Sequence, residues 1–488
     1  MRTRSLRHPR PPGRQTRGTG LPREPRPSRP APESPESALE LAARLCRRKR
    51  GIGGWEIYVE HEERLSIEAR EGEVEALISA RSAGLAIRIL VHGRLGLSYT
   101  NNLLPAAVRE AVERARQAAE YMPREKTRRL ARPEPGEWPA LHISDPGLSQ
   151  IPEREKIRQA LRLESSALAV DPRVTKVRGA EYEESRSRVW VQSSEGVDAR
   201  AETTLVSAGL EAVAEAKGEA QSGSELETVH FYDKLDVVRA GESAAKNAVM
   251  QLGSRPGRGG RRPVVLSPEA AAGLISALAP AASGEAVAKE RSWLAGKIGK
   301  RIGSPLVTVV DDGRWEDGPG AFPFDDEGVP SRRTPVIVAG ALENYLYNTY
   351  YGQLAGTGST GNGVRPAFFL PPEVDSVGWI LVPGQSSEPE LLAQVEAGWY
   401  ITEFLGLHTV DVVTGDFSLG AAGFVIRKGR LMEPVTGIAM AGNLAEVLKR
   451  VRGVGDRLKI GVDAAAPALL IEDVDLSGLA KEKMSDGS

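Results

Sequence analysis

The sequence predicts an α+β protein, in which an N-terminal domain of mixed sheet and helices precedes a mostly β, barrel-like or sandwich-like C-terminal domain. In the first half, runs with apolar residues at every second position are followed by runs with apolar residues spaced by three and four. From Ser304 onward, short apolar runs are separated by Gly, Pro and Asp. This second pattern is typical of successive strands joined by turns.

Strands dominate the start of the first half. Apolar and polar residues alternate over 55–59 and again over 65–69, which predicts strands. Glu71-Gly72 is expected to form a turn, and a further strand over 85–91 is expected to end in a hairpin-like break at 92–94.

Helices are predicted between these strands and the second domain. A short amphipathic helix is expected to begin near Ser37. Residues 104–119 carry apolar side chains at helical spacing, with Asn101 or Asn102 as the expected cap. Another helix is expected over 231–250, after a group of strands.

A chain of 488 residues is too long for one ordinary core, so two domains are expected. The Arg- and Pro-rich start has almost no large apolar residues and is predicted to be disordered, whereas a Gly- and Arg-rich stretch is predicted to be a linker. The predicted segments are a basic tail at 1–37, the α+β domain at 38–252, the linker at 253–262, the mostly β domain at 263–480 and a flexible tail at 481–488.

Composition excludes several classes of protein. The 64 basic and 65 acidic residues nearly cancel, so the chain has no global nucleic-acid signature. Cys46 is the only cysteine, which rules out an intramolecular disulfide and a cysteine-rich zinc site. No run of about 18 apolar residues predicts a membrane span, and the basic N-terminus has no apolar segment of a secretory signal. We therefore expect a cytoplasmic protein.

Motifs in both halves of the chain stand in an order that resembles one family. They are SAGLAIR at 82–88, GRLG at 93–96, FPFDDEGVP at 322–330, YLYNTY at 345–350, STGNG at 359–363, TGDFS at 414–418 and IAMAGNL at 438–444. This ordered set resembles the TldD/PmbA family, whose members are also called modulators of DNA gyrase and are regarded as two-subunit metalloproteases. The resemblance covers roughly residues 50 to 480.

The resemblance also indicates a branch of the family. In the zinc-binding, TldD-type subunit, the helix after the first strand of the second domain carries an HExxxH motif, and a cysteine near the C-terminus is a third ligand. Here the corresponding segment, 268–280, reads PEAAAGLISALAP, and no cysteine follows Cys46. The chain thus resembles the PmbA, or TldE, branch. This implies no catalytic and no metal-binding residue in this chain, and zinc in a TldD-like partner with which it forms a heterodimer or a larger assembly.

Asp325 and Glu327 belong to the densest group of carboxylates in the second domain. Neighbouring carboxylates raise one another's pKa, which suits general acid–base catalysis. In a Pro-flanked loop, carboxylates more often accept hydrogen bonds from nearby backbone amides. The structural interpretation is favoured, and both residues stay candidates for a wall of the cleft.

Two further patterns supply candidate cleft residues. The Gly-rich segment 352–363 is either a flexible loop or exposed backbone that pairs with an extended peptide. A Ser-His-Asp set can also be written around TGDFS, although triads are defined by geometry and such sets arise by chance. With the acidic pair, the candidate residues are completed by Tyr351, Gly361, Asn362, His408, Asp416 and Ser418.

The leading functional hypothesis is the subunit without metal of a TldD/TldE-type zinc metalloprotease that cleaves unfolded or extended peptides. This chain would supply part of the substrate-binding wall and the interface with the partner. A nucleic-acid- or gyrase-associated binding protein is one alternative, with only weak contacts expected from the basic tail. A stand-alone, metal-independent hydrolase is the other.

Overall fold

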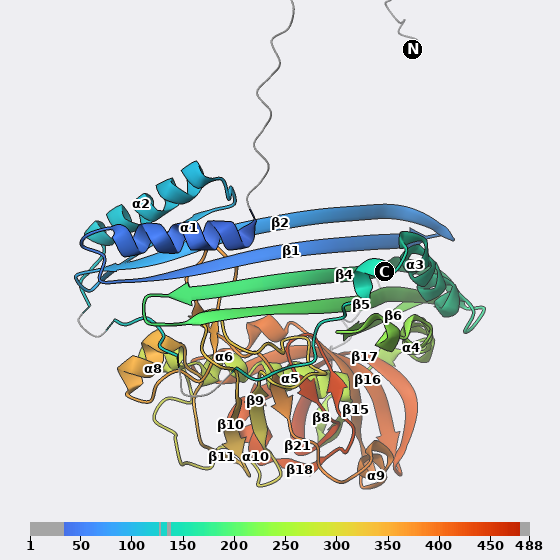
Figure 1. Cartoon of the computed structure of the whole chain (residues 1–488). Coiled ribbons are helices and arrows are strands. Elements are labelled where there is room, and N and C mark those ends of the chain that lie inside the picture. Colours follow the sequence, from blue (N-terminus) through green and yellow to red (C-terminus); the bar gives the residue numbers. More distant parts are fainter. Residues whose placement is uncertain (1–33, 126–127, 134–137, 479–488) are drawn as a thin grey trace, which may run out of the picture.

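The structure of this chain is a computed structural model that describes residues 34–125, 128–133 and 138–478 (Figure 1). The predicted α+β architecture is confirmed. A long antiparallel sheet with helices forms the first half, and a β-barrel with a second sheet forms the other. Residues 1–33 of the predicted tail and the predicted flexible tail at 481–488 lie outside the described residues.

Six antiparallel strands form the N-terminal sheet in the order β3-β2-β1-β4-β5-β6. Several of its strands are unusually long, and β4 has 20 residues. The strands are β1 (Gly54–Arg70), β2 (Glu73–Val91), β3 (Arg94–Thr100), β4 (Val174–Ser193), β5 (Asp198–Ala216) and β6 (Glu219–Val229).

Tight turns join neighbouring strands at three places in this sheet. Each turn has two residues with positive φ, the second of which is glycine. At Glu71-Gly72 the φ angles are 54° and 79°, and at His92-Gly93 they are 52° and 80°. Positive φ at both central residues suits the twist of antiparallel strands, and glycine adopts it without strain. The turns predicted at these two sites are confirmed.

Four helices pack on the sheet as two pairs near its two ends (Figure 1). Apolar side chains of the first pair pack against Trp55, Ile57 and Val59, and those of the second against Ile67 and Tyr182. The pairs are α1 (Pro35–Arg48) with α2 (Pro105–Tyr121), and α3 (Glu153–Leu168) with α4 (Val237–Met250); short 3-10 turns lie at Leu148–Gln150 and Tyr232–Lys234.

Helix starts differ from the predictions for local reasons. Helix α1 begins before the expected Ser37, because the Ser34 side chain accepts a hydrogen bond from the backbone N–H of Ser37 at 3.2 Å. The expected asparagine cap of α2 is wrong: Leu104 occupies the cap position, and Asn102 accepts from the N–H of Leu104 instead. Helix α4 begins only after Asp236, whose side chain caps it.

A closed barrel of five strands forms the centre of the C-terminal half. The neighbours run β21-β8-β15-β16-β17, and pairing of β17 with β21 closes the ring. The predicted linker at 253–262 contains β7 (Arg255–Pro256) and the first residues of β8, so these residues pair with barrel strands. The barrel strands are β8 (Gly260–Leu266), β15 (Ala397–Leu405), β16 (Asp416–Arg427), β17 (Arg430–Asn443) and β21 (Leu469–Gly478), with β18 (Val451–Val454) beside β21.

A second sheet of short strands shares one apolar core with the barrel. Its order is β11 (Ala341–Leu342), β10 (Arg333–Val338), β9 (Val309–Asp312), β14 (Trp379–Leu381), β20 (Ala465–Ala466) and β19 (Lys459–Ile460), and β12 (Gly363–Val364) pairs separately with β13 (Glu373–Val374). The helices of this half are α5 (Pro268–Ser276), α6 (Ala279–Ala282), α7 (Gly284–Ala288), α8 (Thr349–Ala355), α9 (Glu388–Ala393) and α10 (Leu444–Lys449), with a 3-10 turn at Leu407–Thr409.

The two halves meet across the face of the long sheet that is turned away from α1 (Figure 1). Tyr58 and Val191 of the sheet pack there against Phe324 and Val329 of the C-terminal half. No helix in the described part of the chain is long and apolar enough to cross a membrane.

Gly96 of β3 lies at a close contact between the sheet and α2. A Cβ atom at this position would lie 2.0 Å from the Ala115 carbonyl oxygen and 2.4 Å from the Ala119 nitrogen. We expect Gly96→Ala to push α2 outward and to lower the free energy of unfolding by about 1–3 kcal/mol, measured by urea denaturation. Gly53→Ala is the matched control, because its nearest neighbour is 3.4 Å away. Equal stability of the two variants would contradict this close contact.

Candidate functional site

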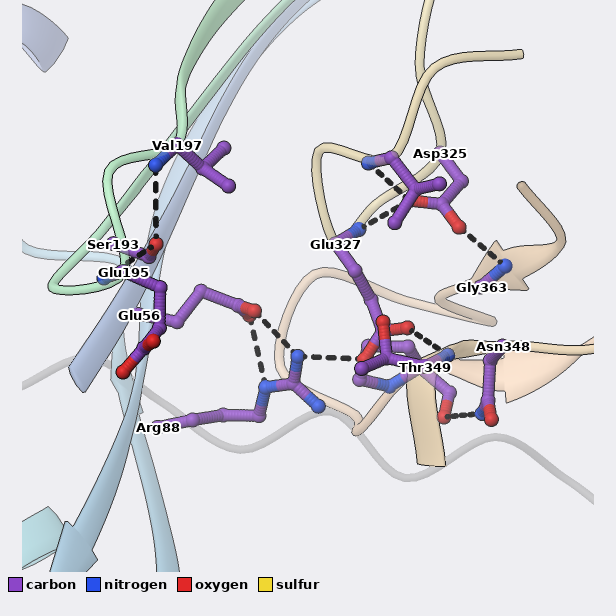
Figure 2. A network of polar contacts seen from close by, with 12 residues as sticks. Glu56, Arg88, Ser193, Glu195, Val197, Asp325, Glu327, Asn348, Thr349 and Gly363 are labelled. Atoms are coloured by element: carbon purple, nitrogen blue, oxygen red, sulfur yellow. Dashed lines mark hydrogen bonds and ion pairs between the residues drawn. The ribbon is translucent and has the colours of Figure 1, made fainter. Parts of the chain in front are cut away.

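Four buried charged residues join the long sheet to the C-terminal half, and we call them the interdomain charge cluster: Glu56, Arg88, Glu327 and Arg365. Arg88 lies between two carboxylates, 2.8 Å from Glu56 through Nε and 2.8 Å from Glu327 through Nη2 (Figure 2). Arg365 donates to Glu56 at 2.9 Å. None of the four side chains is more than 8% exposed.

Strand pairing and one loop place these groups. In the β1–β2 register Glu56 stands directly opposite Arg88, and both side chains lie on the face that meets the C-terminal half. Glu327 comes from the loop before β10, and its second oxygen accepts a hydrogen bond from the N–H of Thr349, the first residue of α8, at 2.7 Å. The cluster therefore links the sheet, this loop and α8.

Asp325 holds the loop in shape by accepting backbone hydrogen bonds. Its Oδ1 accepts from the N–H groups of Glu327 (3.0 Å) and Val329 (2.9 Å), and its Oδ2 accepts from Gly363 (2.8 Å). A Cβ at position 363 would lie 2.8 Å from Glu327 Oε2, so only glycine fits there. The arrangement matches the structural interpretation of the acidic loop, in which carboxylates bind nearby amides.

Burial shifts the pKa values of this region in opposite directions. Burial and the charge of Glu327 raise the pKa of Asp325 well above its usual value. Burial alone would also raise the pKa of Glu327, but the positive charge of Arg88 and the Thr349 hydrogen bonds lower it instead. Burial alone would lower the pKa of Arg88, but the negative charges of Glu56 and Glu327 have the larger effect and raise it. Two adjacent carboxyls thus differ in their tendency to hold a proton.

The Gly-rich segment is folded and buried at its end. Asn362 is 1% exposed, and its amide donates to Asp311 (2.6 Å) and to the Asp375 carbonyl (2.8 Å). Gly361 has a φ of 81° and lies against the Pro330 backbone. The backbone N–H of Gly363 is already bonded to Asp325, so this end of the segment offers no free N–H at that residue for an extended peptide.

The remaining candidate residues are not members of the charge cluster. Tyr351 is half-buried on α8, where burial raises its pKa. His408, Asp416 and Ser418 are exposed on the segment that leads into β16 and on that strand. Asp416 accepts a hydrogen bond from Asn443 at 2.8 Å. Among the described residues no hydrogen bond joins Ser418 to His408 or to an aspartate, so the structure does not assemble a Ser-His-Asp set from them.

Helix α5 follows directly after β8, which by the family resemblance is where the zinc-binding subunit is expected to carry its HExxxH motif. Its apolar residues are buried between the barrel and the second sheet, and Trp379 donates to the Ile275 carbonyl at 2.9 Å. Gly273 is covered by Leu407, which would lie 2.8 Å from a Cβ. Its one carboxylate, Glu269, pairs with Lys459 at 2.5 Å. Side chains of α5 therefore do not fit a zinc ion.

The described part of the chain has two cavities away from the charge cluster. No group of three or more His, Cys, Asp or Glu side chains in residues 34–125, 128–133 and 138–478 is placed to hold a metal ion. One cavity of about 260 Å³ lies between the sheet and α3, and another of about 520 Å³ lies between α4 and the C-terminal half. None of the eight candidate residues lines either cavity.

Sequence reasoning missed three members of the charge cluster: Glu56, Arg88 and Arg365. Glu56 and Arg88 stand in strands as single charged residues between apolar neighbours, which is the usual pattern of a strand with one solvated face. The one available signal was charge complementarity between strands in the predicted hairpin. Recognising it required the register, which follows from the turn at Glu71-Gly72 and the bulge near Glu68.

Comparison with known proteins places this α+β architecture in one class, the metallopeptidases of PmbA/TldD type. Sequence models of the PmbA/TldA metallopeptidase match the chain as domain 1 over 55–119, as the central domain over 146–252 and as the C-terminal domain over 259–478. The chain belongs to the PmbA/TldD family. The resemblance inferred from the ordered motifs is thus confirmed.

Individual relatives come from both branches of the family. The chain is 27% identical to a metalloprotease TldD homolog of Haemophilus influenzae, covering 81% of this chain and 86% of the relative. It is 26% identical to metalloprotease PmbA of Escherichia coli O157:H7, covering 87% and 92%. Identity alone therefore does not separate the two branches.

Solved structures share the whole fold. A proposed modulator of a DNA gyrase from Thermotoga maritima is 27% identical, with a TM-score of 0.83 over 90% of this chain and 100% of that chain. TldE from Thermococcus kodakarensis shares the fold with a TM-score of 0.83 at 24% identity, over 90% and 100% of the two chains.

Proposed function

We propose that this chain is the PmbA/TldE-like subunit of a cytoplasmic, TldD/TldE-type zinc metallopeptidase and does not itself carry the metal. A TldD-like partner holds the zinc, and the substrate is an unfolded or extended peptide. This chain supplies part of the wall that binds the peptide and the interface with the partner. The observation that carries the proposal is the sequence of helix α5, PEAAAGLIS, which has no histidine at the place where the family resemblance expects HExxxH in the zinc-binding subunit.

Zinc hydrolysis needs ligands on one face of a helix and an open coordination position for water. The buried side chains of α5 are alanine, leucine and isoleucine, and they pack into the core. Gly273 and its neighbour Leu407 leave no room for a larger side chain without movement. These features favour a subunit that contributes shape and rigidity to the site of its partner.

The acidic loop supports a bracing role for this chain. The carboxylate oxygens of Asp325 and Glu327 accept hydrogen bonds from backbone amides and from Arg88, and both residues are almost fully buried. A general acid or base must reach the proton that it transfers. Because these two carboxyls face the protein interior, we assign them to the rigid frame of the cleft wall.

The test compares this chain, a TldD-type chain from the same host, and the two expressed together. We expect an isolated complex of the two chains that contains zinc and cleaves an unfolded peptide. Zinc is expected to stay with the TldD-type chain when the two are separated. Each chain alone should show little activity.

A matched control is a complex in which the first histidine of the partner's motif is replaced by alanine. That complex should still form but should lose its zinc and its activity. Stoichiometric binding of zinc by this chain alone would contradict the proposal. Peptidase activity of the pure chain that chelators do not inhibit would contradict it too.

A further inference from the structure

Strand β2 has a free edge over more than half of its length. β1 pairs with β2 from Leu90 to Glu73, whereas β3 pairs with it only from Leu85 to Val91. Within the described residues, no strand lies beside 73–84 on the side away from β1. In Figure 1 this part of β2 runs along the upper edge of the sheet, past the end of α1. Such an edge presents a row of backbone N–H and C=O groups that a further strand can pair with.

The middle of this free edge has little of the usual protection against pairing. Natural edge strands are commonly blocked by charged side chains, above all lysine, by proline or by a covering helix, and the charged residues here are Glu73, Glu75 and Arg81 on either side of 76–80. Between residues 73 and 84 there is no lysine and no proline, and the side chains of Ile78, Leu77 and Val74 are 61%, 39% and 39% exposed. Exposed apolar residues along an open strand edge mark a surface that another chain covers.

We propose that a second copy of this chain pairs with the free edge of β2, antiparallel and around a two-fold axis at Ile78. In this register Ile78 faces Ile78 of the other copy. The small residues Ala76 and Ala80 face each other on either side, and Glu75 faces Arg81. A two-fold interface brings the same patch of both copies together, so every contact occurs twice. The two sheets become one continuous sheet.

The length of the free edge fits this register. Position 72 of one copy comes opposite position 84 of the other, next to Thr100, where β3 ends. The turn at Glu71-Gly72 is held firmly, because the buried carboxylate of Glu164 accepts hydrogen bonds from both N–H groups, at 2.6 and 2.9 Å. The incoming hairpin therefore fills the edge up to the end of β3.

An aromatic group lies at that end of the edge. The rings of Tyr99 and Phe369 are 5.2 Å apart, and Phe368 packs over Gly84, where a Cβ would lie 2.3 Å from its ring. Tyr99 is 49% exposed and Phe369 is 39% exposed. Exposed aromatic residues are enriched where protein partners bind. The turn of the second copy would be next to this group.

Charge reversal tests the register. Opposite charges that face each other across antiparallel strands stabilise the pair, and like charges oppose it. We expect the wild type to sediment as a dimer of 52.4 kDa chains at micromolar concentration. Glu75→Arg alone and Arg81→Glu alone should each raise the dissociation constant by about tenfold or more, because two like-charged pairs form per dimer. The double variant should regain the dimer.

Rescue by the double variant separates the contact between copies from local effects. Within one chain Glu75 pairs with Arg70 at 3.0 Å and Arg81 with Glu63 at 3.7 Å, and the double variant restores neither pair. A monomeric wild type would overturn the proposal. A dimer that is indifferent to both single reversals would overturn it too. The pairing needs no zinc and no second kind of subunit, so its failure is distinct from failure of the proposed function.

A single introduced cysteine gives an independent readout. Cys46 is 2% exposed, and burial raises its pKa to about 12, so it stays unreactive in the folded protein. Ile78→Cys should form a covalent dimer rapidly with a short bis-maleimide, whereas Val462→Cys, at a site that is 79% exposed, should not. Equal rates of crosslinking in the two variants would overturn the two-fold axis at Ile78.

Discussion

Replacing Arg88 by methionine is expected to lower the free energy of unfolding by about 3–5 kcal/mol. Methionine fills much of the same space but leaves the buried Glu327 without its cation, whereas Glu56 keeps Arg365. Removing one partner of a buried ion pair is costly, because the remaining charge is isolated from water. Urea denaturation at pH 7 measures the loss. Arg114→Met is the matched control, since Arg114 is half-exposed on α2 and its contacts with Glu110 and the Tyr99 carbonyl lie at the surface.

A second substitution shows whether the cost comes from the buried charge of Glu327, which has lost its cation. Adding Glu327→Gln to the Arg88→Met variant removes one buried negative charge, so we expect it to recover part of the lost stability. In the wild-type background, Glu327→Gln should instead destabilise the protein, because Glu327 pairs with Arg88 and accepts from Thr349. Loss of less than about 1 kcal/mol in Arg88→Met would mean that water or movement of the loop compensates the charge.

The overall architecture was predictable because it depends on local patterns. The alternation over 55–59 and the glycine turns at 71–72 and 92–93 predict a meander, and the helical spacing over 104–119 predicts α2. Closure of the barrel is different, since it depends on pairing between β17 and β21, and no local pattern reports that contact.

The candidate site was predictable only in part, for the same reason. The acidic loop and the Gly-rich segment stand out by composition, and the structure brings Asp325 and Gly363 into one hydrogen bond. Sequence patterns do not identify Glu56 and Arg88 as buried residues, because the alternation of polar and apolar side chains assigns their face of the strand to solvent. Here that face is covered by the C-terminal half, and 239 positions separate Arg88 from Glu327.

Asp325→Ala is expected to destabilise the protein by about 3 kcal/mol, since it leaves three buried N–H groups without an acceptor. Part of this cost is offset, because the substitution also removes the repulsion between Asp325 and Glu327. Asp325→Asn keeps one oxygen for the N–H groups of Glu327 and Val329 but turns an NH₂ group toward Gly363, so we expect a smaller loss of about 1–2 kcal/mol. Urea denaturation of both variants gives the comparison.

The pH dependence of the asparagine variant decides which effect controls Asp325. A carboxyl whose pKa is raised in the folded state contributes stability that is fully present below its unfolded pKa, about 3.9. This contribution is lost as the pH rises through the folded pKa. Asparagine does not titrate, so the stability advantage of the wild type over Asp325→Asn should be largest below about pH 4 and should shrink as the pH rises through the folded pKa of Asp325. Glu327 titrates in both proteins, and because its charge interacts with that of Asp325, the difference reports the titration of the pair. An advantage that grows with pH would instead show that the three backbone hydrogen bonds outweigh burial and hold Asp325 ionised.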